Sequence, residues 1–214
     1  MRHFIRLALA ALVLAAPASA FASGGNYSFD GGTQPEQTQV TAALNASSFP
    51  WSVAPGLVVV HIVRGMDSHA LPGQIWLDAN LLDSGAFSWG VVQHEYAHVV
   101  DFAVLTDAMR LQLHVLLQGT AWWGASEHAG LDSERFADLV SWAYWTSPDN
   151  VMRPLSAQDE GGQVAPAVFR AELASLLPGM PLDAQPVRVT ASVKPRCTPH
   201  AATASARALR CPRP

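Results

Sequence analysis

Five residues near the middle of the chain have the types and the spacing of a metal-dependent hydrolytic site. They read His94-Glu95-Tyr96-Ala97-His98. On an α-helix, side chains four positions apart lie one above the other, so both imidazoles can face one ion. Imidazole nitrogens suit zinc, and the adjacent carboxylate suits a general base that takes a proton from a zinc-activated water. The motif therefore predicts zinc-dependent hydrolysis, with His94 and His98 as ligands and Glu95 as the base.

The flanking sequence predicts the elements that position this motif. Ser88 can serve as a helix N-cap, and apolar residues continue a helical face on both sides of the motif without a proline. Before it, residues 73–80 place β-branched and aromatic side chains between a glycine and an asparagine, which is typical of a strand. We therefore expect a strand followed closely by the helix that carries both histidines.

A catalytic zinc ion takes a third protein ligand and keeps a fourth position open for water. Glu134 is the best candidate, because it lies at the start of a second helix that we expect from residue 132 onward. Asp138 follows four residues later and shares a face of that helix. Asp101, three residues after His98, is the alternative: it would either replace Glu134 as a ligand or orient a histidine.

These two motifs make residues 73–145 resemble the gluzincins, the thermolysin-like branch of the zincin metallopeptidases. Residues 134–138 read E-R-F-A-D, which is similar to the second motif of compact gluzincins, although thermolysin itself is a much longer chain. The resemblance implies that Glu134 binds zinc and that Asp138 hydrogen-bonds the far nitrogen of a ligand histidine, His94. It also implies that the substrate is a peptide or a protein.

The resemblance has two further implications for the site. It implies that the strand at residues 73–80 is a sheet edge that pairs with an extended peptide. It also implies a histidine or tyrosine that stabilises the oxyanion formed during hydrolysis. His128 and Tyr144 are the candidates, and the sequence does not choose between them. Trp122 and Trp123, in the stretch between the two motifs, are expected to be buried.

The first residues predict export from the cytoplasm. Residues 1–22 combine two arginines, an apolar run from Leu7 to Ala16 and A-x-A sites for cleavage. The apolar run is too short to span a bilayer, so the segment is expected to be a cleavable signal peptide. We expect the mature protein to be secreted and to have no transmembrane segment.

The rest of the chain is expected to form one α+β domain over residues 37–186, with a minimal zincin-like layout. A small mixed sheet with an edge strand would come first, followed by the active-site helix and a helical C-terminal half. Residues 23–36 contain many glycine, serine and asparagine residues and are expected to be loose. Further elements are expected as a helix at 37–44, a strand at 57–63, and helices at 105–117 and 165–177.

Residues 187–214 form a basic tail, because every Asp and Glu lies at or before Asp183. The tail holds the two cysteines, Cys197 and Cys211, which are expected to pair in an oxidising compartment. In the loop-entropy description, such a bridge stabilises a fold by about 3 kcal/mol. The tail is a candidate for contact with an anionic surface. Basic residues interleaved with aromatic ones are lacking in the body of the sequence, which argues against nucleic acid as a partner.

Two functional hypotheses from different classes remain. The first is a secreted, monomeric zinc metallopeptidase. The second is a non-catalytic extracellular or cell-wall-binding protein that retains a zincin fold. Glu95 separates them, because a degenerate site would most readily lose its general base. The first hypothesis is therefore favoured, and zinc-dependent cleavage of a non-peptide amide is a variant that the motifs leave open.

Overall fold

The computed structural model describes residues 24–124 and 130–183, in which six helices and a sheet of four strands are found. The strands are β1 (Tyr27–Gly31), β2 (Val58–Val63), β3 (His69–Leu71) and β4 (Gln74–Asp78). The helices are α1 (Gln34–Ala46), α2 (Ala79–Leu82), α3 (Trp89–Val104), α4 (Asp107–Leu117), α5 (Asp132–Tyr144) and α6 (Pro166–Leu176), together with the short 3₁₀ helices η1 (Trp51–Val53) and η2 (Gly85–Ser88). The α+β class predicted from the sequence is confirmed.

The sheet is mixed and has the order β1-β2-β4-β3. β1, β2 and β4 are parallel, and β3 is antiparallel to β4. Burial alternates along the strands, with Val60 of β2 and Ile75 of β4 among the side chains that face the core. The opposite face carries a stack of rings, in which Trp76 lies between His61 at 4.5 Å and His69 at 4.9 Å.

The edge of the sheet differs from the expectation. Residues 73–80 were expected to supply the edge strand, but β4 lies between β2 and β3, so β3 forms that edge. β3 reverses into β4 through Pro72 and Gly73, and Gly73 has a φ of 73°, a conformation that glycine adopts easily. A three-residue strand is too short for its hydrophobic pattern to reveal it.

The expectation of a loose segment before residue 37 is also wrong in part. β1 pairs in parallel with β2, from Tyr27 opposite Val58 to Gly31 opposite Ile62. Tyr27 and Phe29 pack against the core, which offsets the conformational cost of ordering a segment rich in small residues. The helix that follows, α1, begins at Gln34 rather than at residue 37.

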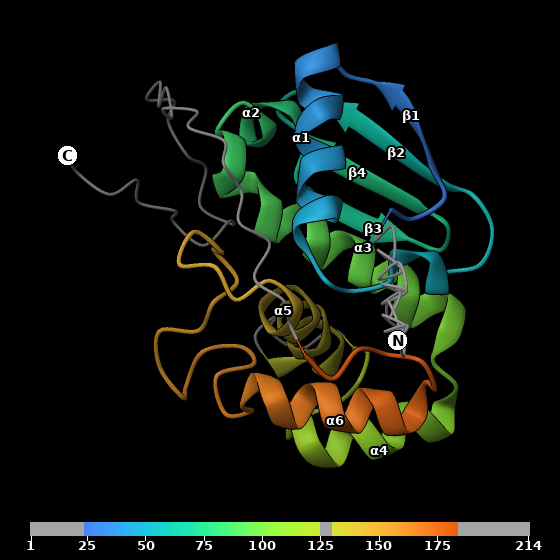
Figure 1. Cartoon of the computed structure of the whole chain (residues 1–214), viewed down its shortest axis with the longest axis vertical. Helices are drawn as coiled ribbons and strands as arrows, with labels where there is room; N and C mark the ends of the chain where they lie inside the picture. Colours follow the sequence, from blue (N-terminus) through green and yellow to red (C-terminus); the bar gives the residue numbers. More distant parts are fainter. Residues whose placement is uncertain (1–23, 125–129, 184–214) are drawn as a thin grey trace, which may run out of the picture.

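α3 is the central element of the molecule, because it contacts α1, β3 and β4 on one side and α5 on the other. Figure 1 shows the sheet in the upper half of the view, with α1 across it, and α4, α5 and α6 in the lower half. All residues of α3 from Trp89 to Asp101 are buried, as expected for a helix enclosed on every side. The Ser88 hydroxyl donates to the Gly85 carbonyl, so Ser88 precedes α3 without capping it through its side chain.

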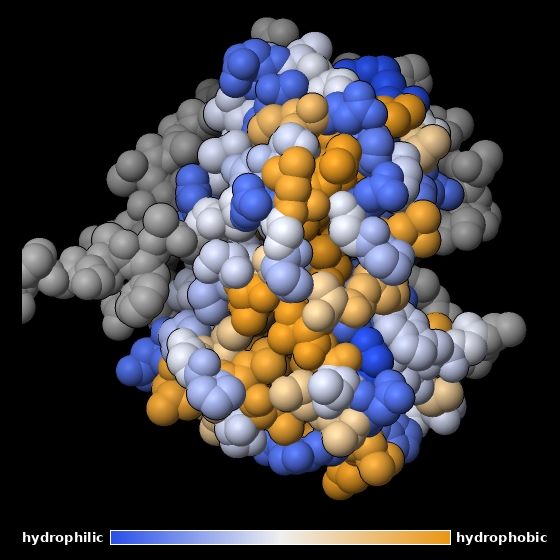
Figure 2. Space-filling view, turned by 90° about the vertical axis from the view of Figure 1, so that its right-hand side faces the viewer, coloured by the Kyte–Doolittle hydropathy of each residue, from blue (hydrophilic) through white to orange (hydrophobic). Residues whose placement is uncertain are grey.

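Part of the apolar surface remains outside the core. Figure 2 shows apolar residues gathered in a band along the middle of one face, between more polar margins. Large apolar side chains with substantial exposure include Leu71, Leu111, Val115 and Trp123. Within the described part of the chain, the helices are too short or too polar to cross a bilayer.

Candidate metal centre

The residues of the two motifs meet at the contact between α3 and α5. His94 and His98 lie one turn apart on α3, and Glu134 lies in the first turn of α5. Their ligand atoms converge: the two Nε2 atoms are 3.1 Å apart, and Glu134 Oε2 lies 3.3 Å from that of His94 and 3.2 Å from that of His98. All three side chains are buried. This group can hold a metal ion.

The distances between these ligand atoms can be compared with those around a bound zinc ion. Zinc binds nitrogen and oxygen ligands at about 2.0–2.2 Å in a tetrahedron, whose ligand atoms are therefore about 3.3–3.6 Å apart. The three separations at this site, 3.1 to 3.3 Å, are close to that range. Two imidazoles and a carboxylate are also the donors of a catalytic site that leaves one position for a further ligand. The residues present therefore fit a zinc-sized ion.

Asp138 determines which nitrogen of His94 is available to a metal. Its Oδ1 accepts a hydrogen bond from Nδ1 of His94 at 2.8 Å, and both side chains are buried. With the proton held on Nδ1, the lone pair of Nε2 points toward His98 and Glu134. The resemblance to gluzincins implied this contact, and the geometry agrees with it.

The ionisable groups of this site shift one another's pKa. Burial opposes a charge on His94, but the hydrogen bonds to Asp138 and Glu134 outweigh it and raise its pKa well above the ordinary value. Burial likewise raises the pKa of Asp138 to about 6, against the opposing effect of His94. A cation bound at Nε2 of His94 would replace the proton on that atom, while Nδ1 would keep its hydrogen bond to Asp138.

Glu95 lies beside the three candidate ligands. It is buried on α3 between the two histidines and lines the cavity onto which the ligand atoms open. Burial raises its pKa, and the positive charge of His94 and His98 lowers it to a smaller extent. A carboxylate with a raised pKa accepts a proton more readily, as a general base at neutral pH requires.

The cavity has a volume of about 230 Å³ and two contrasting walls. One wall is formed by His69 and Ala70 of the β3 edge and by Ser68 just before it. The other is aromatic, with Phe102 of α3 and Trp123 from the segment before α5. Trp123 is 44% exposed, so the expectation that it is buried is wrong. Its ring lies 5.2 Å from that of Phe102 and nearly parallel to it, at 9°.

His69 is a residue of this site that the sequence reasoning missed. Its Nδ1 donates to the Asp67 carbonyl at 2.8 Å, and its ring stacks on Trp76 at an angle of 1°. These contacts fix the ring orientation and leave Nε2 as the other polar atom of the ring. Only the pairing of β3 with β4 brings His69 to the cavity, so spacing along the chain carried no signal of its role.

The remaining candidates lie elsewhere. Tyr144 is fully buried at the end of α5, where its ring packs on Phe49 at 5.1 Å, so it does not join the described wall of the cavity. The Asp101 carboxylate accepts hydrogen bonds from Nε of Arg110 at 2.9 Å and from Nε1 of Trp122 at 3.0 Å, which removes it as the third ligand. His128, Cys197 and Cys211 lie outside the described residues.

Comparisons with protein-family models, with curated proteins and with solved structures found no match. The chemistry open to the site follows from its geometry. That geometry is a buried group of two imidazoles and one carboxylate that can hold a metal ion, with the Glu95 carboxylate beside it.

Proposed function

We propose that this protein is a zinc-dependent metallopeptidase of gluzincin type. One observation carries the proposal: the metal-ligating atoms of His94, His98 and Glu134 open onto the same cavity as Glu95. A site that only needs a metal for stability closes its coordination sphere with a fourth protein ligand. Three protein ligands, a cavity and an adjacent base are the parts of a hydrolytic site instead.

The ligand set supports zinc as the metal. Imidazole nitrogen and carboxylate oxygen together suit zinc, whereas calcium and magnesium prefer oxygen ligands alone. Zinc bound here would supply Lewis acidity to a water molecule and to the substrate carbonyl. The hydrogen bond from His94 to Asp138 would keep Nε2 of His94 free for the ion.

Glu95 supplies the proton chemistry in this proposal. It accepts a proton from the attacking water and delivers it to the amine that leaves when the peptide bond breaks. Its burial favours the first step, because a carboxylate with a raised pKa takes up a proton near neutral pH more readily than an exposed one. His69, across the cavity from the aromatic wall, takes the place of Tyr144 as a candidate that contacts the reacting carbonyl, and His128 stays a prediction.

A peptide substrate is supported by the β3 edge. β3 pairs with β4 on one side, and its other side borders the cavity through residues 68–70. An extended peptide can add to such an edge through backbone hydrogen bonds, which would place one of its peptide groups beside Glu95. Because the peptide would lie along the β3 edge, only the residues next to the cleaved bond would need to enter the cavity.

The proposal places the protein outside the cytoplasm, after removal of residues 1–22. A secreted enzyme could form the bridge between Cys197 and Cys211. The basic tail at residues 187–214 would then be free to contact an anionic surface.

Cleavage of an unfolded protein substrate tests the proposal, with the wild type beside the Glu95→Gln variant. We expect the wild type to cleave the substrate, to lose activity with a chelator and to regain it with zinc. Glu95→Gln should bind zinc equally well and lose nearly all activity, because the amide cannot accept the proton. Zinc binding by both proteins without any cleavage would favour the non-catalytic hypothesis.

A further inference from the structure

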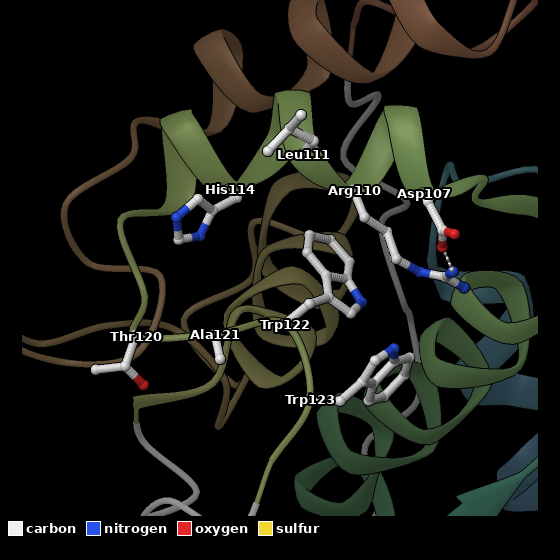
Figure 3. A pocket seen from close by; sticks show the side chains of 8 residues that line it. All are labelled: Asp107, Arg110, Leu111, His114, Thr120, Ala121, Trp122 and Trp123. Atoms are coloured by element: carbon white, nitrogen blue, oxygen red, sulfur yellow. Dashed lines mark hydrogen bonds and ion pairs between the residues drawn. The ribbon is translucent and has the colours of Figure 1, made fainter.

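A second cavity lies between α4 and the segment that leads to α5. Its volume is about 350 Å³. Arg110, Leu111 and His114 line it from α4, and Trp122 and Trp123 line it from the opposite side. Figure 3 shows the two tryptophans rising from their segment toward the underside of α4. We refer to this space as the α4 cavity.

The α4 cavity adjoins the metal-binding cavity, because Trp123 contributes to the walls of both. A row of rings connects the two spaces: His98 lies 6.4 Å from Phe102, and Phe102 lies 5.2 Å from Trp123. An extended peptide advances about 3.3 Å per residue. A substrate whose peptide bond lies at Glu95 therefore reaches the α4 cavity within a few residues.

The charged and polar groups of the α4 cavity are bound to partners within the protein. Arg110 donates to the carboxylates of Asp101 and Asp107, and its guanidinium lies 5.7 Å from the centre of the Trp123 ring. Nε1 of Trp122 also donates to Asp101. His114 is hydrogen-bonded to Asp132. The positive charge of Arg110 is therefore already neutralised by two carboxylates, so the cavity offers little attraction to an anionic group.

The apolar groups of the same cavity, in contrast, are partly open to solvent. Leu111 is 67% exposed and Trp123 is 44% exposed. An occupant that covered both would bury apolar surface from each partner, which is favourable in proportion to the area removed from water. An aromatic or branched aliphatic side chain matches this surface, and a charged or strongly polar one does not.

We propose that the α4 cavity receives a large uncharged apolar side chain of the peptide that is cleaved at the metal centre. The α4 cavity is then the subsite that determines sequence preference, with Leu111 and Trp123 as its contact surfaces. This inference rests on the proposed peptidase function, since it assigns the occupant to the same substrate. The preferred substrate carries an aromatic or branched aliphatic residue a few positions from the cleaved bond.

The experiment compares Leu111→Arg with Val115→Arg in the full chain. Both residues lie on α4, both are largely exposed, at 67% and 73%, and only Leu111 lines the cavity. A peptide series that varies one position at a time between Phe, Leu, Ala and Asp reports the preference as ratios of kcat/KM. We expect the wild type and Val115→Arg to prefer Phe or Leu at one position, and Leu111→Arg to lower that preference about tenfold.

A binding measurement separates this inference from the proposed function. The uncharged probe N-acetylphenylalanine amide is titrated into each protein, and the indole N–H resonances are followed by NMR. We expect the Trp123 resonance to shift in the wild type and in Val115→Arg, and to shift much less in Leu111→Arg. Probe binding without peptide cleavage would refute the peptidase and leave an apolar binding site in the α4 cavity. Cleavage with the same preference in all three proteins, or an unmoved Trp123 resonance in the wild type, would overturn the inference.

Discussion

Replacement of Asp138 by Asn tests how the protein prepares His94 for a metal ion. The Asp138 carboxylate accepts the Nδ1 hydrogen bond of His94 at 2.8 Å, and both side chains are buried. A hydrogen bond to a charged group contributes about 1.5–3 kcal/mol, and less when the acceptor is a neutral amide. Loss of such a partner of a metal-ligating histidine lowers metal affinity by about 10- to 100-fold. The two estimates agree, because tenfold corresponds to about 1.4 kcal/mol.

The assay is competition for zinc against a chromophoric chelator at pH 7.5. This pH lies above the pKa of Asp138, which burial raises to about 6, so the wild-type carboxyl group is ionised. Asp149→Asn is the matched control, because Asp149 is exposed beyond the end of α5 and the substitution removes the same charge. We expect a 10- to 100-fold weaker affinity in Asp138→Asn alone. Equal affinities in the wild type and Asp138→Asn would refute the reasoning.

Three further predictions concern pH, packing and the β3 edge. Zinc affinity, measured by chelator competition, should fall as the pH is lowered, because the raised pKa of His94 lets protons compete with the metal. Without zinc, the stability contributed by protonated His94 should be lost as the pH rises through that pKa, which urea unfolding across pH measures. Gly90→Ala should destabilise the protein by about 1–3 kcal/mol, because the new Cβ would lie 2.5 Å from the buried Asn150 side chain, and a wild-type urea midpoint would contradict this. His69→Ala should reduce kcat for peptide cleavage while zinc affinity stays unchanged, and unaltered turnover would exclude His69 from the reaction.

The parts of the fold and site that the sequence predicts well are local. His94 and His98 face one ion because a helix repeats every 3.6 residues, and the same spacing relates Glu134 to Asp138. The α3 helix could be recognised from its continuous apolar flanks. These features need no knowledge of how distant segments pack.

The parts that were missed depend on tertiary contacts. His69 reaches the cavity because β3 pairs with β4, and three residues are too few to show a strand period. Tyr144 was a candidate by its helix and its chemistry, but α5 turns it toward Phe49 in the core. Trp123 was expected to be buried like most tryptophans, yet it forms the shared wall of two cavities.

Crystallographic anomalous scattering at the zinc absorption edge would test the central claim most directly. We expect one strong peak at about 2.0–2.2 Å from Nε2 of His94, Nε2 of His98 and a carboxylate oxygen of Glu134, with Glu95 beside it and the remaining coordination position facing the cavity. A peak bound by other residues, or none at this centre in crystals grown with zinc, would contradict the account.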